Sequence, residues 1–166
     1  MSPIILLDEQ AIRRRKDEPV DDIPKGEFLM VSVGSLIPRK GFERLIHVCG
    51  LLKSRGYHFH LLILGKGELY EVLAEQVIDE HLRDSVQLLG FRDNPYPYMA
   101  AADLYVCPSY VEGFSTVVSE AVVLETPVVT TDCSGMREIL GDSEYGLITQ
   151  NTEESLFEGL RTMLDK

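Results

Sequence analysis

Residues 104–120 read LYVCPSYVEGFSTVVSE, an apolar run followed by a loop that turns into a helix. The run 104–108 has the composition of a strand that is buried on both faces. Glu112 and Glu120 bracket the loop and the start of the helix, whose free N–H groups and partial positive charge suit a phosphate. Because open α/β sheets bind ligands at the carboxyl ends of their strands, this segment predicts a ligand site at that end.

The spacing of the two glutamates leaves two interpretations open. If Ser115 caps the helix, Glu120 lies in its second turn, where its carboxylate can reach a ribose hydroxyl. The alternative is an ordinary glutamate on the surface of a helix. Spacing alone does not separate the two, so the rest of the chain has to be considered.

Outward from this segment, apolar runs alternate regularly with segments of helical periodicity. The spacing predicts strands at 28–34, 60–65, 86–90, 104–107, 127–131 and 146–149. Helices are expected at 42–52, 69–77, 96–102, from Ser115, near 135–140 and from Thr152. This alternation predicts an α/β fold with a doubly wound, Rossmann-like parallel sheet, helices on both faces and right-handed connections.

Residues 1–27 differ from the rest in composition. The basic run Arg13–Lys16 is followed by acids and two prolines, which is typical of a solvated linker with one short helix around Glu9–Lys16. A membrane-surface contact is the alternative interpretation of the basic run, and the adjacent acids argue against it. We therefore expect 1–27 to be a linker or extension and 28–166 to be one ligand-binding domain.

Composition excludes several classes of function. The chain has 166 residues, which fits one domain, and a net charge of −11, which argues against a nucleic-acid binder. Its three cysteines are odd in number and far apart, as expected of reduced thiols in the cytoplasm. No apolar run has the length of ~18 residues that spans a bilayer.

A second candidate phosphate site is the loop 34–41, GSLIPRKG, between the first strand and the first helix. Gly34 and Gly41 allow close approach of the backbone, while Arg39 and Lys40 supply positive charge at the N-terminus of the helix. The loop lacks the pattern of a Walker sequence. Three other motifs fail. Gly65-Lys66-Gly67 lacks the third glycine of an NAD fingerprint, and Val117 replaces the glycine that the nucleophile elbow of a hydrolase needs. The four histidines are not spaced as a metal cluster.

Taken in order, these motifs resemble the C-terminal half of retaining glycosyltransferases of the GT-B fold, the large group often called family four. The resemblance rests on Gly34-Ser35-Leu36 with Lys40-Gly41, on 89–91 and 102–109, on Glu112-Gly113-Phe114 through Glu120, and on the strand after Thr126. It covers about residues 28–166. Several motifs in the right order are far more specific than any one of them.

The resemblance implies a role for each matching residue. Lys40 would contact the donor diphosphate, Glu120 the ribose hydroxyls, and Glu112 the donor sugar or the reacting phosphate. Backbone N–H groups of 114–116 would hold the distal phosphate or sugar, and Phe91 lies where the backbone meets the nucleobase. Lys40 and Glu112 are thus the catalytic candidates. The nucleotide-sugar-binding candidates are Gly34, Ser35, Arg39, Lys40, Phe91, Gly113, Phe114, Ser115, Thr116 and Glu120.

The sequence departs from the family pattern in two places. Ser35 stands where the family commonly has an arginine aimed at the phosphates, and Arg39 is the candidate to replace it. Glu125 stands where a glycine commonly precedes the fifth strand. The chain also has no room for the second domain of a GT-B enzyme, so we expect an excised C-terminal domain that lacks its N-terminal acceptor domain and is inactive alone.

The sequence therefore predicts the donor-binding domain of a retaining glycosyltransferase that transfers a hexose from a UDP- or GDP-linked sugar to an acceptor hydroxyl. The resemblance implies no cofactor and no metal, a cytoplasmic location, and peripheral membrane association of the full enzyme as one option. The rivals are a non-catalytic nucleotide-binding or regulatory module and a GT-B sugar-nucleotide epimerase. The spacing of Glu112 and Glu120 favours the transferase.

Overall fold

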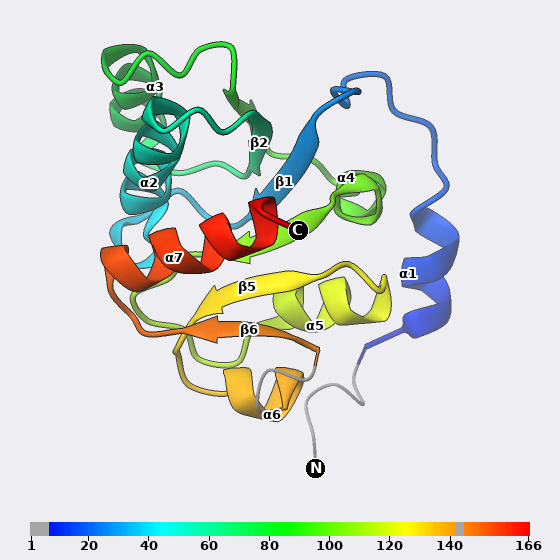
Figure 1. Cartoon of the computed structure of the whole chain (residues 1–166). Helices are drawn as coiled ribbons and strands as arrows, with labels where there is room; N and C mark the ends of the chain where they lie inside the picture. The colour runs from blue at the N-terminus through cyan, green and yellow to red at the C-terminus, as the bar shows by residue number, and fades with distance from the viewer. Residues whose placement is uncertain (1–6, 142–144) are drawn as a thin grey trace.

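The computed structural model describes residues 7–141 and 145–166, which form a six-stranded parallel sheet between two layers of helices (Figure 1). The sheet order is β3-β2-β1-β4-β5-β6. The strands are β1 Phe28–Val33, β2 Phe59–Leu64, β3 Val86–Gly90, β4 Leu104–Cys107, β5 Val128–Thr131 and β6 Gly146–Thr149. Each predicted strand is present to within one residue at either end, and the predicted doubly wound fold is confirmed.

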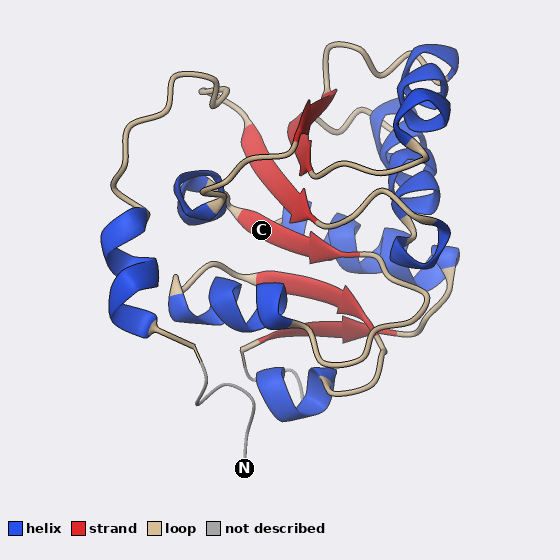
Figure 2. Ribbon diagram, turned by 180° about the vertical axis from the view of Figure 1, so that it is seen from behind, coloured by secondary structure: helices blue, strands red, loops and turns tan. Residues whose placement is uncertain are grey.

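The helices are α1 Glu9–Arg15, α2 Phe42–Ser54, α3 Tyr70–Asp79, α4 Tyr96–Ala101, α5 Thr116–Val123, α6 Met136–Leu140 and α7 Glu153–Leu164, with a 3-10 turn, η2, at Pro38–Lys40. Two buried clusters divide them between the faces of the sheet. One cluster packs α2, α3 and α7 on the face seen in Figure 1. The other packs α4, α5 and α6 on the face seen in Figure 2.

The strands are buried because both faces of the sheet are covered. In β4 and β5 every residue is buried, and in β1 only the two end residues are partly exposed. A strand covered by helices on both sides needs apolar residues at consecutive positions, not at alternate ones. This requirement explains why continuous apolar runs located the strands correctly.

The chain changes direction in the sheet between β1 and β4. From β1 it builds outward through β2 to β3, then returns to place β4 on the other side of β1 and continues through β5 to β6. The pairing at this junction is short, with two matched positions between β1 and β4 against six between β1 and β2. The junction is the topological switch point, where open sheets of this kind bind their ligands.

The segment before β1 packs against the domain, which differs from the expected solvated linker. Helix α1, predicted at Glu9–Lys16, lies beside α4 and α5, as both ribbon views show (Figures 1 and 2). Ile12 is only 4% exposed, and Asp22 accepts hydrogen bonds from Arg92 and Tyr98. Ile12 is the buried residue of this helix, and the charged composition around it concealed its role.

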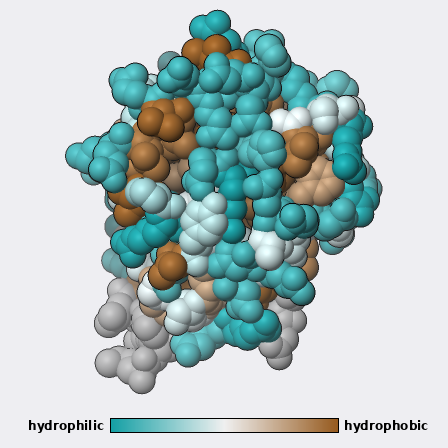
Figure 3. Space-filling model, turned by 90° about the vertical axis from the view of Figure 1, so that its left-hand side faces the viewer, coloured by the Kyte–Doolittle hydropathy of each residue, from teal (hydrophilic) through white to brown (hydrophobic). Residues whose placement is uncertain are grey.

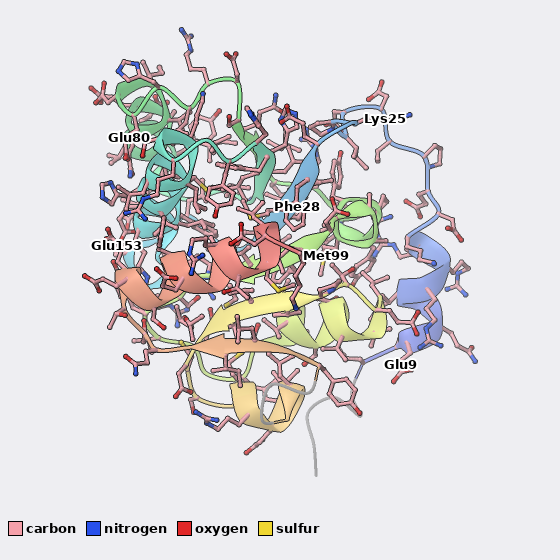
Figure 4. The ribbon with its side chains drawn as sticks, viewed as in Figure 1. Glu9, Lys25, Phe28, Glu80, Met99 and Glu153 are labelled. Atoms are coloured by element: carbon pink, nitrogen blue, oxygen red, sulfur yellow. The ribbon has the colours of Figure 1, made fainter. Side chains whose placement is uncertain are left out.

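Helices α2, α3 and α7 are also joined by polar contacts on one side of the molecule. Glu80, just after α3, and Glu153, at the start of α7, lie on the same side in Figure 4. The His47 ring lies between them, with Nδ1 2.9 Å from Oε1 of Glu80 and Nε2 3.3 Å from Oε1 of Glu153.

No helix within the described ranges is both long and apolar enough to cross a membrane.

Candidate functional site

The two loops predicted to form a site meet at the carboxyl ends of β1 and β4. Gly41 has φ +72°, and a Cβ atom built on it would lie 2.1 Å from the carbonyl oxygen of Pro108. Only glycine fits such an approach in a left-handed conformation. The close approach brings the loop after β1, with its cations, against the loop after β4, with its carboxylate.

Lys40 and Glu112, the two catalytic candidates, form an ion pair across this junction although 72 residues separate them in sequence. The Nζ of Lys40 lies 2.9 Å from Oε2 of Glu112, and their side chains are 20% and 10% exposed. Ser109 donates a hydrogen bond of 2.6 Å from its hydroxyl to the same carboxylate oxygen. A cation held in place by a carboxylate and shielded from bulk water is suited to an anionic ligand.

Helix α5 directs its N-terminus toward the same region. Ser115 is its N-cap, as predicted, and its hydroxyl accepts a hydrogen bond from the N–H of Val118 at 3.1 Å. Within the described residues, the N–H groups of Phe114, Ser115 and Thr116 donate to no backbone carbonyl. These three donors, together with the partial positive charge of the helix end, are suited to an anion.

Glu120 lies in the second turn of α5 and is partly buried. The Tyr96 hydroxyl, from α4, donates a hydrogen bond to its Oε2. The pKa of the Glu120 carboxyl is raised, because the effect of burial is larger than the opposite effect of the hydrogen bond from Tyr96. Tyr96 is a site residue that sequence reasoning missed, because nothing in its local sequence indicates a partner 24 positions away.

A cavity of about 380 Å³ lies at the carboxyl ends of β1, β2 and β3. It contains three predicted residues, Gly34, Ser35 and Phe91, and its remaining lining residues are Val33, Leu64, Gly65, Lys66, Arg92, Asp93 and Pro95. Phe91 is 59% exposed, and the Nζ of Lys66 lies 5.2 Å from the centre of its ring. An exposed aromatic ring at the mouth of a cavity is suited to contact with a planar base.

A larger groove of about 840 Å³ lies at the opposite edge of the sheet, near the amino ends of β5 and β6. Its lining is mostly apolar, and the predicted site residues lie elsewhere. Size alone therefore does not locate the site. We favour the smaller cavity because it lies at the carboxyl ends of the strands, contains the cations Lys66 and Arg92, and includes Gly34 and Ser35 from the loop that carries Lys40. Figure 3 views the molecule from the side toward which β5 and β6 point, and a hydrophilic band runs between apolar patches there.

Arg39, the candidate to replace the arginine absent at position 35, lies outside the cavity that Ser35 lines. Its side chain is exposed, and its backbone carbonyl accepts a hydrogen bond of 2.9 Å from the N–H of Tyr110. The cavity is lined neither by Arg39 nor by Lys40, Glu112, 113–116 or Glu120. The cations that line the cavity together with Ser35 are Lys66 and Arg92. The sequence analysis had considered Lys66 only as part of a weak NAD motif.

Arg44 is a second residue that sequence reasoning missed. Its guanidinium is buried, donates to the carbonyls of Pro108 at 3.0 Å and Ser109 at 2.8 Å, and also bonds Asn151. It stacks on Tyr110 with 3.9 Å to the ring centre. Burial lowers its pKa from the ordinary value, although an arginine remains charged at neutral pH. Arg44 therefore fixes the loop that carries Glu112.

The family model and the relatives that match this chain are all glycosyltransferases. The family model described as glycosyl transferases group 1 matches residues 13–166. A Campylobacter jejuni relative, N-acetylgalactosamine-N,N'-diacetylbacillosaminyl-diphospho-undecaprenol 4-alpha-N-acetylgalactosaminyltransferase, is 39% identical over 148 residues, which cover 88% of this chain and 40% of the relative. The lipopolysaccharide glucosyltransferase WaaG of Escherichia coli is 32% identical over 147 residues, covering 86% of this chain and 38% of the relative.

Solved structures agree with this relationship. The crystal structure of WaaG, a glycosyltransferase involved in lipopolysaccharide biosynthesis, matches with a TM-score of 0.77 and 28% identity over 100% of this chain and 43% of that one. Anabaena HepE in complex with UDP shares the fold, with a TM-score of 0.75 at 23% identity over 99% and 44% of the two chains. The chain thus spans about 40% of the length of the relatives it matches.

Proposed function

This chain belongs to the group 1 glycosyl transferases, and on that premise we propose that it binds the nucleotide-sugar donor of a retaining glycosyltransferase. The observation that carries the proposal is the convergence of Lys40, Glu112 and the N-terminus of α5 at the carboxyl ends of β1 and β4. A cation and a row of free N–H groups together are suited to a diphosphate, which carries negative charge on both phosphate groups.

The donor diphosphate lies between Lys40 and the N–H groups of 114–116 in this proposal. Both partners stabilise the charge that develops on the leaving diphosphate, and both are held in position before the ligand arrives. Glu112 orients Lys40 through their 2.9 Å contact and approaches the donor sugar or the reacting phosphate. In this proposal the nucleoside extends toward the cavity lined by Gly34 and Phe91. Glu120 accepts hydrogen bonds from the ribose.

The complete reaction involves a second domain in this proposal. The relatives are more than twice as long as the matched region, and GT-B enzymes place the acceptor on another domain across a cleft. We propose that the full enzyme transfers a hexose to an acceptor hydroxyl with retention, and that this chain alone binds nucleotide without transferring sugar. Half a site gives a Kd nearer 1 mM than 1 μM, a loss of up to about 4 kcal/mol of binding free energy.

The test is a calorimetric titration of UDP, GDP and ADP into the purified chain and into Lys40→Ala, with Lys53→Ala as the matched control. Lys53 lies at the other end of α2, where its ammonium donates to the carbonyl of His81. One charge-assisted contact is worth roughly 1.5–3 kcal/mol, so Lys40→Ala should weaken diphosphate binding about tenfold or more. The matching free nucleoside should be affected much less, and Lys53→Ala should change neither affinity.

Two results would contradict the proposal. Failure of all three nucleotides to bind at millimolar concentration would remove the nucleotide site. Equal losses for the nucleoside and the diphosphate in Lys40→Ala would mean that Lys40 supports the fold and makes no contact with phosphate. Robust sugar transfer by this chain without another domain would contradict the two-domain part of the proposal alone.

A further inference from the structure

The contact between Tyr96 and Glu120 joins three elements that are distant in sequence. Tyr96 lies at the start of α4, Glu120 lies on α5, and the guanidinium of Arg15 on α1 lies 5.6 Å from the centre of the Tyr96 ring. The Tyr96 hydroxyl donates to Oε2 of Glu120. One face of the tyrosine is thus covered by a cation, while its hydroxyl is fixed on the carboxylate.

The direction of this hydrogen bond is settled by protonation. Burial, with the neighbouring Glu120 carboxylate, raises the pKa of Tyr96 to about 12, so its hydroxyl keeps its proton and remains a donor at neutral pH. The bond opposes the effect of burial on Glu120 and so favours the ionised carboxylate. A carboxylate has about four acceptor positions, which leaves Oε1 and part of Oε2 available to a ligand.

Arg15 is held over the ring by contacts of its own. The side-chain amide of Asn94 donates to the backbone carbonyl of Arg15 at 2.8 Å, and the guanidinium lies 3.4 Å from the carboxylate of Asp93. Ile12, three residues earlier, anchors α1 in the apolar layer. The helix before the first strand is therefore in contact with the residue that orients Glu120.

We propose that Tyr96 is a positioning residue that orients Glu120 for recognition of the ribose hydroxyls, and that Arg15 holds Tyr96 in place. The inference rests on the proposed function, because it assigns the ribose to Glu120. A free glutamate loses torsional freedom when it binds a ligand, whereas a glutamate already fixed at one oxygen loses little. Removing the tyrosine hydroxyl therefore weakens recognition of the ribose without removing a direct ligand contact.

The experiment compares Tyr96→Phe with Tyr98→Phe. Tyr98 is on the same helix, and its hydroxyl also donates to a carboxylate, at 2.7 Å from Oδ1 of Asp22, so the two variants lose equivalent groups. Each is titrated with UDP and 2′,3′-dideoxy-UDP, or with the GDP or ADP pair if one of those binds better. We expect Tyr96→Phe to bind the natural nucleotide about tenfold more weakly and the dideoxy analogue within twofold of wild type.

Tyr98→Phe should leave both affinities within twofold of wild type.

A second pair of variants tests the role of α1. Arg15→Gln should lower affinity for the natural nucleotide about threefold, since it removes the cation over the ring but keeps the hydroxyl. Arg13→Gln should leave it unchanged, because Arg13 pairs only loosely with Glu9, at 3.8 Å on the same helix.

The outcomes separate this inference from the proposed function. Unchanged or tighter binding by Tyr96→Phe, or equal losses for both ligands, would overturn the inference while nucleotide binding itself stands. If wild type binds the nucleotide and its dideoxy analogue equally, Glu120 does not recognise the ribose, and the inference falls with that assignment. If none of the nucleotides binds, the inference and the proposed function fall together.

Discussion

Replacing Gly41 by alanine tests whether the close approach of two loops builds the site. Gly41 has φ +72°, and the added Cβ would lie 2.1 Å from the carbonyl oxygen of Pro108 and 3.3 Å from Nε of Arg44. A carbon and a carbonyl oxygen normally stay about 3.3 Å apart or more, so the Pro108 carbonyl would have to retreat by about 1 Å. That movement breaks the 3.0 Å hydrogen bond from Arg44.

The expected loss of stability has two parts. A left-handed conformation costs an alanine about 1–2 kcal/mol. Losing a hydrogen bond from a buried charged group adds about 1.5–3 kcal/mol. Gly41→Ala should therefore lower the free energy of unfolding by about 2.5–5 kcal/mol. Because Arg44 also holds Ser109, the displaced loop should separate Lys40 from Glu112 and weaken diphosphate binding about tenfold.

Gly56→Ala is the matched control, measured with Gly41→Ala by urea unfolding. Gly56 has φ +90°, and no heavy atom lies within 4 Å of the added Cβ. Alanine there has the cost of the left-handed conformation but no steric clash. We expect a loss of about 1–2 kcal/mol and unchanged nucleotide affinity. Equal destabilisation by the two substitutions would refute the reasoning, because it would mean that the loops after β1 and β4 are not in tight contact.

Two further substitutions test the loop and the ribose site. Arg44→Met should lower the free energy of unfolding by about 1.5–3 kcal/mol, since it leaves the buried carbonyl of Pro108 without its donor, whereas the Ser109 carbonyl still accepts from Thr131; a thermal unfolding series with Arg55→Met, an exposed position, is the comparison. The affinity of wild type for nucleotide should fall on acidification, beginning above the usual range of a glutamate, because the pKa of Glu120 is raised and a protonated carboxyl accepts ribose hydroxyls poorly. Calorimetry across a pH series should show this fall in wild type and a flat profile in Glu120→Gln. The raised pKa also means that folded Glu120 holds its proton more tightly than unfolded Glu120, so its contribution to stability should decline as pH rises through the interval between the two pKa values.

The parallel sheet was predictable because its strands are covered on both faces. Runs such as 28–34 and 104–107 are apolar at consecutive positions, and few other structures require that pattern in short segments. The N-cap at Ser115 was equally local, since it depends on groups three residues apart. Strands and helix caps can be predicted from the sequence because the residues that cause them lie in the same short segment.

The missed features all depend on partners far along the chain. Arg44 reads as a polar position on a helix, and its burial depends on carbonyls more than 60 residues away. Helix α1 packs through Ile12 and through contacts of Arg15 with Asn94 and Tyr96, which lie far along the chain, so composition alone predicted a solvated linker. The role of Arg39 was inferred from its adjacency to Lys40 in the turn at 38–40, and it stays a prediction. Tertiary contacts of this kind need the order of the strands before they can be inferred.

The short pairing between β1 and β4 has a consequence for the motions of the domain. With two matched positions at this junction against six between β1 and β2, the halves β1–β3 and β4–β6 share few backbone hydrogen bonds where the candidate site lies. Local opening occurs where such bonds are fewest, and a ligand that binds only the closed form opposes it. A diphosphate between Lys40 and the N-terminus of α5 would act as a reversible cross-link between the halves, and amide hydrogen exchange would slow in both strands together.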